Sequence, residues 1–507
     1  MESICRYKEL MELFKDYCNT TYEIYRLHNS NEKEINKIYN DIKNNLIQTS
    51  LFSPDEVLQA ILDASYYNHR YIKSYLNIFN KIYADYKEYI HEDNKLLRNF
   101  DLRVNLMDVY EENAIYRAIM NDDKKSFIIF TELEDFDKNQ RLNSKLFQYE
   151  PVSLLELCCY HGAVDCFKLL RTKFNSEITE KCLDFSFLSG NPDIISECLK
   201  NQKPGEISMK HAIISHNIDF ISFLMNEYNI KIKLELCYKY HNLQAFFVYL
   251  DQTNDINGCF IHSPCFGIKS LCEYFLSHGV NVNAKDKENR TILHYATIYG
   301  RKKILENLLT HRVDIDAKDN YQKTPIHYAV EMGYQDIVEL LISNGANINA
   351  ADQDKYAAIH IASSKTCRSM VDFLISHGAL INVQDSSGFT PLHHATQCNR
   401  IEIAELLILN GADVNIKDKY GSTPLLYAAN NKRNEISELL ISHGADINET
   451  DQYKRTSLHY SVIYQNDYLK ELLLSHGADT NIKDYSGRKY IDYLNYDSYN
   501  DLSFLGD

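Results

Sequence analysis

The sequence predicts an all-α fold, a helical-repeat solenoid preceded by an N-terminal helical domain. Glycine and proline are scarce, at 17 and 8 of 507 residues, and tryptophan is absent, which argues against collagen-like, disordered or turn-rich all-β chains. A motif of the form Thr-x-(Leu/Ile)-His-x-Ala returns every 33 residues in the C-terminal half, and a fixed period of this length indicates a repeat array. Elsewhere, apolar residues recur three and four positions apart, as in amphipathic helices.

Residues 1–150 are expected to form the N-terminal helical domain. Ser53, Pro54 and Glu56 have the types and spacing of a helix start, with a capping hydroxyl, a proline at the first position and an acid at the third. A stripe of apolar and tyrosine residues follows, formed by Ile72, Tyr75, Leu76, Phe79, Ile82, Tyr83, Tyr86 and Ile90. We interpret it as bundle core; a seam for a partner helix is the alternative, although strict heptads are not sustained. The charged residues 121–140 are expected to connect this bundle to the solenoid.

Residues 151–253 show the same helix pattern with less regularity, and we expect stacked helix pairs with shortened loops. Ser153 to Gly162 has the residue types of the first helix in a later repeat, and Lys181 to Gly190 gives another such start. Asn217 and Asn242 fall where later repeats have glycine, the residue that ends a helix in the left-handed conformation.

Two registers define an array at residues 254–490. The first is the motif itself, with steps of 33 residues and an aspartate five positions before each copy. The copies begin at Thr291, Thr324, Ala357, Thr390, Thr423 and Thr456, and their aspartates are Asp286, Asp319, Asp352, Asp385, Asp418 and Asp451. Asp484 continues the series into a final worn unit, and residues 491–507 are expected to form a C-terminal tail.

The second register is a glycine after an apolar stretch, in the place where a left-handed residue ends a helix. It contains Gly279, Gly345, Gly378, Gly411, Gly444 and Gly477. Arg312 occupies the position between Gly279 and Gly345 where the series lacks a glycine. It must either adopt the strained left-handed conformation or avoid it. Replacing Arg312 with glycine is therefore expected to raise stability by about 0.5–1 kcal/mol.

Motif, period and register together resemble the ankyrin repeat. The resemblance implies helix pairs joined by short β-hairpin loops, with the motif's histidine bonded to the loop backbone so that it links adjacent units. It also implies a non-catalytic role in binding proteins through the hairpin tips and the concave face. The stretch from Ser153 to Asn257 is similar to an uncharacterised domain that precedes ankyrin arrays in a large family of parasitic-protist proteins, and that resemblance carries no known activity.

The sequence gives little support to catalysis. No nucleotide-binding, nucleophile-elbow, zinc-protease or kinase motif is present. Cys158, Cys159, His161 and Cys166 have ligand-like spacing, but their register places them inside a helix pair, so a zinc site is the weaker interpretation. We therefore expect no catalytic residue, no metal and no cofactor. The alternative is an enzyme or a regulated catalytic module in residues 1–150, with the repeats as its substrate-recruiting arm.

The variable positions of the hairpins are the expected protein-binding site. Family resemblance places three such positions in each unit, which gives 21 positions. Five of them are tyrosine, a fraction about three times that of the whole chain, where 38 of 507 residues are tyrosine. Tyrosine is a common interface anchor. The predicted anchors are Tyr321, Tyr356, Phe389, Tyr420, Tyr453 and Tyr485, and the predicted basic contacts are Arg290, Lys323, Lys419, Arg455 and Arg488. Scatter in a tyrosine-rich chain is the alternative reason for the enrichment.

The net charge of the chain and its lack of targeting signals limit the class of its binding partner and its location in the cell. The net charge of −16 repels nucleic-acid backbones and anionic lipid surfaces, so a protein partner is expected. The start, Met1 to Arg6, lacks the regions of a secretory signal, and no apolar stretch is long enough to span a membrane. Thirteen scattered cysteines fit reduced thiols. A cytoplasmic location is expected, and unconventional export is the alternative.

Overall fold

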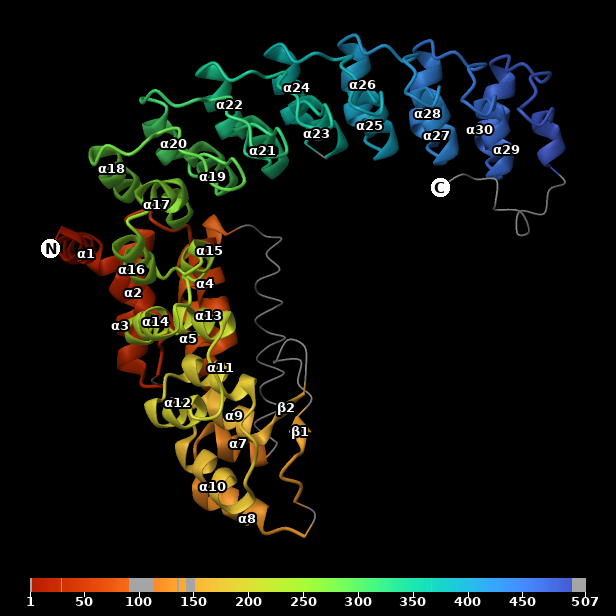
Figure 1. Ribbon diagram of the computed structural model, residues 1–507. Helices are drawn as coiled ribbons and strands as arrows, with labels where there is room; N and C mark the ends of the chain where they lie inside the picture. The colour runs from red at the N-terminus through yellow and green to blue at the C-terminus, as the bar shows by residue number, and fades with distance from the viewer. Residues whose placement is uncertain are drawn as a thin grey trace. The chain divides into compact units, whose positions relative to one another are not determined.

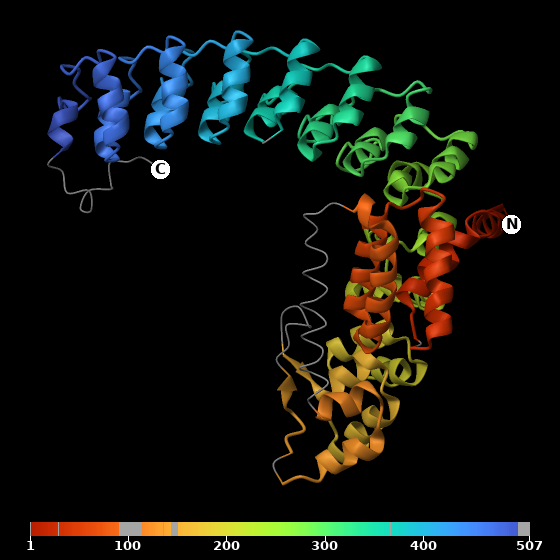
Figure 2. The ribbon, with the colours of Figure 1, turned by 180° about the vertical axis from the view of Figure 1, so that it is seen from behind.

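The computed structural model describes residues 2–28, 30–90, 114–134, 136–142, 151–365 and 367–494. The chain divides into two compact units, the first ending at Phe275 and the second beginning at Leu276 (Figure 1, Figure 2). Both units are helical, which confirms the predicted all-α class. Within the described residues the only strands are β1 (Arg141–Leu142) and β2 (Val152–Ser153), which pair antiparallel. The finer division into four ranges stays a prediction.

A helical bundle opens the first unit. Its helices are α1 (Glu2–Leu13), α2 (Lys15–Tyr25), α3 (Glu32–Ile42), α4 (Pro54–Tyr67) and α5 (Ile72–Tyr86), with a π-helical turn at Lys43–Ile47 and 3₁₀ turns at His69–Tyr71 and Lys87–Tyr89. The predicted helix start is confirmed: the Ser53 amide donates to the Glu56 carboxylate at 2.8 Å, and the Glu56 amide donates to Ser53 Oγ at 3.2 Å. The bundle-core interpretation is also confirmed, since Tyr75, Phe79 and Ile82 are fully buried.

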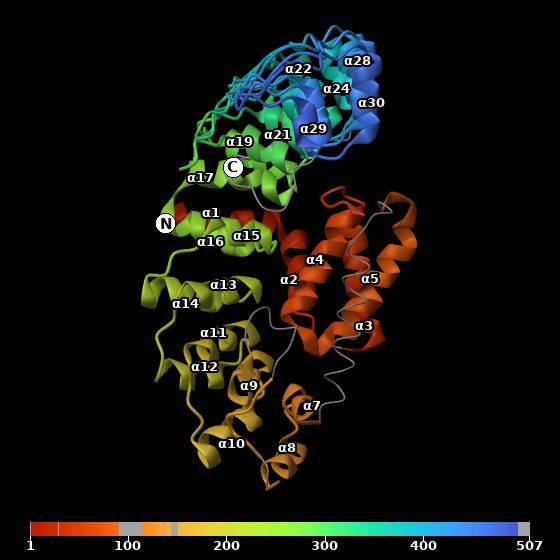
Figure 3. The ribbon, with the colours of Figure 1, turned by 90° about the vertical axis from the view of Figure 1, so that its right-hand side faces the viewer.

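Stacked helix pairs follow the bundle in the first unit. The pairs are α7 (Ala114–Met120) with α8 (Lys124–Thr131), α9 (Leu154–His161) with α10 (Val164–Phe174), α11 (Glu180–Ser189) with α12 (Pro192–Leu199), α13 (Glu206–Ile214) with α14 (Ile218–Tyr228), and α15 (Leu234–Lys239) with α16 (Leu243–Thr253). The bundle lies alongside this stack (Figure 3), and rings of the two parts meet: Tyr25 stacks on His216 at 4.7 Å and Tyr67 meets Tyr240 edge-on at 5.7 Å. Aromatic packing therefore joins the bundle to the stack.

The charged segment predicted as a connector contributes a helix to the stack, so that prediction is wrong for residues 124–131. It contains α8, which packs on α7 as the second helix of a pair. The Asp122 carboxylate accepts from the amides of Asp165 and Cys166, at 3.1 and 3.0 Å, and thereby caps the start of α10 in the next pair. The negative charge of Asp122 therefore stabilises the free amides at the start of α10.

Histidines end two helices where asparagines were predicted to do so. His216 and His241 have φ values of 50° and 52°, and Asn217 and Asn242 instead begin the next helices. The Asn217 side chain accepts from the Phe220 amide at 3.2 Å. Because asparagine is among the best N-caps, it serves the second helix better than the end of the first.

The second unit contains the helix pairs of the array. The first unit ends with α17 (Ile256–His262), a 3₁₀ turn (Ser263–Phe266) and most of α18 (Lys269–Ser277). The second unit then forms α19 (Ile292–Ile298), α20 (Lys302–Leu308), α21 (Pro325–Met332), α22 (Gln335–Ser343), α23 (Ala358–Ser364), α24 (Arg368–Ser376), α25 (Pro391–Gln397), α26 (Ile401–Leu409), α27 (Pro424–Asn430), α28 (Asn434–Ser442), α29 (Ser457–Ile463), α30 (Asp467–Ser475) and a 3₁₀ turn (Tyr490–Tyr493). First helices pack on first helices, as α23 does on α25, and second helices pack on second helices, as α24 does on α26. Their loops gather on one side of the array (Figure 3).

Arg312 avoids the left-handed conformation. It is absent from the residues with positive φ, whereas Gly345, in the equivalent position one repeat later, has φ 92°. Helix α20 ends at Leu308, and its counterpart α22 runs two residues further, to Ser343. The expectation that glycine at position 312 would relieve strain is therefore wrong, because the earlier helix end leaves no strain to relieve.

No helix in the described ranges is both long enough and apolar enough to cross a membrane.

Candidate protein-binding surface

Each hairpin of the array is built around the aspartate that precedes the motif. Asp418 shows the pattern: Oδ1 accepts from the amides of Tyr420 and Ser422, both at 2.8 Å, and the Asp418 amide donates to the Ser422 carbonyl at 3.0 Å. The same bonds recur in every unit from Asp286 to Asp484. One carboxylate therefore fixes the shape of each tip before any partner binds.

Backbone hydrogen bonds hold neighbouring tips in register. The Gln353 amide donates to the Tyr321 carbonyl at 2.9 Å, the Gln452 amide to Tyr420 at 2.8 Å, and the Tyr485 amide to Tyr453 at 2.9 Å. In each case the donor follows its aspartate by one position and the acceptor follows the preceding aspartate by two. The tips consequently form one hydrogen-bonded row along the array.

Motif histidines link consecutive units, as the resemblance implied. The Thr324 amide donates to His327 Nδ1 at 3.1 Å, and His327 Nε2 donates to the Tyr356 carbonyl of the next hairpin at 3.0 Å. Equivalent bonds run from His294, His393 and His459 to carbonyls 29 residues onward, while His360 reaches Val383. Burial lowers the pKa of His360 and of His393 to about 4, so these rings are neutral and structural at pH 7.

Four of the predicted anchors are exposed at the tips. The exposed fractions are 60% for Tyr321, 50% for Tyr420, 40% for Tyr453 and 71% for Tyr485. Tyr420, Tyr453 and Tyr485 lie on three consecutive tips joined by the backbone bonds described above, whereas Tyr321 is three tips away from Tyr420. We call Tyr420, Tyr453 and Tyr485 the tyrosine cluster.

Tyr356 and Phe389, also predicted as anchors, are half-buried and pack on inner rings. Tyr356 lies 5.1 Å from the His394 ring, and Phe389 lies 5.4 Å from His394 and 5.1 Å from the Tyr427 ring. Their main contacts are therefore with the first helices of the array, which they brace from the hairpin side.

The predicted basic residues differ in their ion pairs and in their exposure to solvent. Arg290 pairs with Glu288 at 2.8 Å, and Lys323 pairs with Glu331 at 3.0 Å. Arg455 is only 9% exposed, and its guanidinium lies 5.4 Å from the Tyr453 ring centre. Lys419 is exposed.

The last predicted basic residue, Arg488, and one that was not predicted, Lys454, lie next to the cluster. Arg488 lies over the Tyr493 ring at 4.9 Å and approaches the Asp484 carboxylate at 3.5 Å. Lys454 is exposed, and its ammonium group lies 5.3 Å from the ring centre of Tyr485. Sequence reasoning missed Lys454 because it follows its aspartate by three positions, outside the variable set.

A buried row of acceptor carboxylates lies beneath the tips. Oδ2 of Asp319 accepts from the Tyr328 hydroxyl at 2.5 Å, and the same pairing at an interval of nine residues recurs at Tyr295, Tyr427, Tyr460 and Tyr493. These carboxylates already accept two amides and a hydroxyl. They are structural, which leaves the exposed cations of the hairpins uncompensated by their own aspartates.

The cysteine and histidine group at residues 158–166 has the character of core. Cys158, Cys159 and Cys166 are fully buried, and burial raises the pKa of the Cys158 thiol well above its usual value. The described residues contain no group of three or more His, Cys, Asp or Glu side chains placed to hold a metal ion. The geometry around these thiols disfavours thiolate chemistry.

Two family models match parts of this chain. Residues 263–352, 349–418 and 408–484 match the family model for ankyrin repeats (3 copies), and residues 174–249 match a domain of unknown function, DUF3447. No curated protein matches the chain. Among solved structures, the ankyrin repeat domain of Bcl-3, described as a unique member of the IkappaB protein family, matches at 26% identity and a TM-score of 0.38, over 41% of this chain and 95% of its own.

Proposed function

We propose that this chain, whose residues 263–484 are ankyrin repeats preceded by a DUF3447 domain, is a non-catalytic interaction module or scaffold that binds a protein partner. The observation that carries the proposal is the tyrosine cluster on three consecutive tips. Exposing three large aromatic side chains beside one another gives a soluble chain no folding benefit, and such clusters serve as interface anchors. Because the tips are fixed by internal hydrogen bonds, little ordering cost is added on binding.

The charges around the cluster favour an acidic partner surface. Lys419 and Lys454 are exposed beside it, while Asp418, Asp451 and Asp484 are buried and already bonded. Because the chain has a net charge of −16, the rest of its surface repels an acidic partner. The exposed lysines therefore orient the chain so that the tyrosine cluster faces that partner as the two approach. The proposed binding surface is therefore the tyrosine cluster with Lys419 and Lys454.

The other predicted site residues have supporting roles in this proposal. Tyr356 and Phe389 brace the hairpins against the first helices, and Arg455 supports the Tyr453 ring from beneath. Arg290, Lys323 and Tyr321 lie on earlier tips and would extend the surface for a long partner. The proposal also includes a cytoplasmic location and the four-part division of the chain. We further propose that the chain is an ankyrin protein of the parasitic-protist type.

Affinity capture tests the proposed surface. The intact chain is compared with the triple variant Tyr420→Ala, Tyr453→Ala, Tyr485→Ala, using lysate from the source cells and mass spectrometry. The control variant carries Tyr89→Ala, Tyr228→Ala and Tyr468→Ala, which remove three tyrosines of similar exposure, at 72%, 37% and 51%, from outside the hairpins. Circular dichroism must show equal helicity for all three proteins.

The proposal predicts that specific partners are captured by the intact chain and by the control but lost from the cluster variant. Equal capture by all three proteins would contradict the assignment of the surface. Loss of capture on deletion of residues 1–150, with no effect of the cluster variant, would move the binding function to the N-terminal domain.

A further inference from the structure

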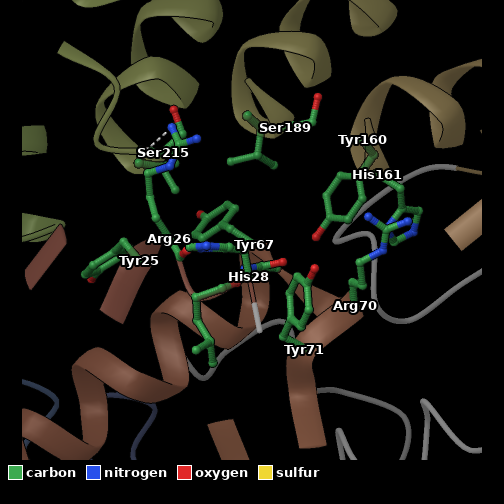
Figure 4. Close-up of a pocket in the computed structure, with 14 residues that line it drawn as sticks. Tyr25, Arg26, His28, Tyr67, Arg70, Tyr71, Tyr160, His161, Ser189 and Ser215 are labelled. Atoms are coloured by element: carbon green, nitrogen blue, oxygen red, sulfur yellow. Dashed lines mark hydrogen bonds between the residues drawn. The ribbon is translucent and has the colours of Figure 1, made fainter. Parts of the chain in front are cut away.

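The first unit contains a cavity of about 180 Å³ between the N-terminal bundle and the stacked helix pairs. Its walls come from the end of α2, the turn after α4, and the ends of α9, α11 and α13. Figure 4 shows Arg26 on the side of Ser215 and Arg70 on the side of His161, with Tyr67, Tyr71 and Tyr160 between them. The cavity thus has a cation at each end and phenol rings in the middle.

The lining is strongly biased in charge. The described residues around the cavity include two arginines, two histidines and four tyrosines but no aspartate or glutamate, in a chain with 70 acidic residues and a net charge of −16. Two guanidinium groups with no carboxylate among the described lining residues give the cavity a net positive charge. The distribution of charge therefore favours a negatively charged occupant.

Hydrogen-bond donors in the cavity are left over. Arg70 makes no hydrogen bond or ion pair with any residue that the structure describes, and the Tyr71 hydroxyl likewise makes no hydrogen bond within that part of the chain. To the residues that the structure describes, Arg26 donates one side-chain bond, to the Ser215 carbonyl at 3.3 Å. A guanidinium has five N–H donors, so capping the end of α13 explains one donor of Arg26 and none of Arg70.

His161 adds no charge of its own to the cavity. Burial, together with the nearby His69 and Arg70, holds the pKa of His161 well below its usual value. The His161 ring pairs through Nε2 with the Tyr116 hydroxyl at 3.1 Å. It is neutral at pH 7, and Arg26 and Arg70 supply the cationic charge of the cavity.

We propose that this cavity binds a small organic phosphate, a monoester whose organic part is about the size of one ring. The volume is close to the roughly 150 Å³ of cavities that accept benzene. Guanidinium groups match phosphate oxygens in geometry and form charge-assisted hydrogen bonds with them, and the Tyr71 hydroxyl adds a donor. The tyrosine faces provide apolar area for the organic part. The proposal does not depend on the function of the array.

Calorimetric titration of the full chain with phenyl phosphate tests the proposal, with phenol, benzoate and inorganic phosphate as comparison ligands. Phenyl phosphate is expected to bind more tightly than each of the other three, because only it combines the ring with a phosphate. Failure to bind, or equal binding of benzoate, would overturn the assignment of an organic phosphate.

Variants locate the site. Arg70→Gln is expected to weaken phenyl phosphate binding by about tenfold or more, and Arg70→Lys is expected to restore part of the loss, because a cation returns without the planar fork. Arg117→Gln makes the same charge change at an exposed position of α7 outside the cavity lining and should leave the affinity unchanged. Unchanged binding by Arg70→Gln with intact helicity, or equal losses in Arg70→Gln and Arg117→Gln, would overturn the site.

Discussion

Nε2 of His394 lies 2.9 Å from Oδ2 of Asp385, at the position where five other units place a tyrosine hydroxyl against the equivalent aspartate. Asp319 and Tyr328 form that common pairing at 2.5 Å. The tyrosine form does not gain or lose a proton between about pH 4 and 8, whereas a histidine can. One repeat thus has a titratable group in a buried pairing that is otherwise insensitive to pH.

This substitution adds to the acid sensitivity that the buried motif histidines already give the array. Burial lowers the pKa of His394 despite the opposing effect of Asp385, so below about pH 6.5 the unfolded chain takes up a proton that the folded chain resists. The stabilisation is therefore fully present above about pH 6.5 and is lost as the pH falls toward the lower folded-state pKa. His394→Tyr is expected to lose less melting temperature between about pH 7.5 and pH 5 than the parent.

Melting curves at the two pH values check this, and His377→Tyr, which changes an exposed histidine, is the control. The control should follow the parent. An equal loss in His394→Tyr and the parent would show that the buried pair does not titrate with unfolding.

The histidine links predict a pair of opposite effects on stability. His327→Leu leaves the buried Thr324 amide and the Tyr356 carbonyl without their partner, which is expected to cost about 1–3 kcal/mol. Leu426 occupies the equivalent position in the repeat of Asp418, so Leu426→His is expected to gain up to about 1 kcal/mol by reaching the Arg455 carbonyl. Denaturant unfolding measures both, and a destabilised Leu426→His would show that this repeat has repacked around leucine.

Two left-handed glycines differ in what surrounds them. A Cβ at Gly388 would lie 2.9 Å from the Lys419 amide nitrogen and 3.0 Å from Asp418 Cα, whereas a Cβ at Gly411 would meet nothing within 4 Å. Both substitutions by alanine pay the left-handed penalty of about 1–2 kcal/mol, and Gly388→Ala adds a clash with the backbone of the next hairpin. Gly388→Ala should therefore be the more destabilising in chemical denaturation by about 1 kcal/mol or more. Equal losses would mean that the two hairpins separate easily.

The regular part of the fold was predictable because each repeat carries its own local signals. Thr324 and Pro325 mark a first helix, a left-handed glycine ends most second helices, and these signals return every 33 residues. The pattern was less informative before residue 254, where spacing varies. There the asparagines at 217 and 242 could be aligned with either the end of one helix or the start of the next, and only the φ values of the preceding histidines decide between them.

Arg312 gives a prediction whose sign the structure reverses. Its backbone avoids positive φ, and its carbonyl accepts from the Asn283 side chain at 3.0 Å. Glycine here would add freedom to the unfolded chain without relieving strain, so Arg312→Gly is expected to lower the free energy of unfolding by about 0.5–1 kcal/mol. A rise in melting temperature would show strain that the backbone angles do not reveal.

The site was predictable at the level of hairpin positions but not of individual exposure. Sequence spacing places Tyr356 and Tyr453 at tips, yet Tyr356 turns toward the first helices, where the His360 and His394 rings pack on it. The cavity at Arg26 and Arg70 had no sequence signal at all, since its two cations are 44 positions apart and line one cavity only because the bundle packs against the stack.

The charge of the hairpin surface predicts how a captured partner associates. Lys419→Gln with Lys454→Gln removes the exposed cations beside the tyrosine cluster while leaving the hairpin bonds intact. The association rate is expected to fall several-fold at low salt, with a smaller change in the dissociation rate, because rim charges steer encounter more than they hold the complex. Raising the salt concentration should remove the difference in association rate between variant and parent, because salt screens the lysine charges of the parent. Surface plasmon resonance at two ionic strengths measures both rates, with Lys303→Gln and Lys432→Gln as the charge-matched control outside the tips. An unchanged association rate at low salt would contradict an acidic partner surface, and it would leave the three tyrosines as the sole basis of recognition.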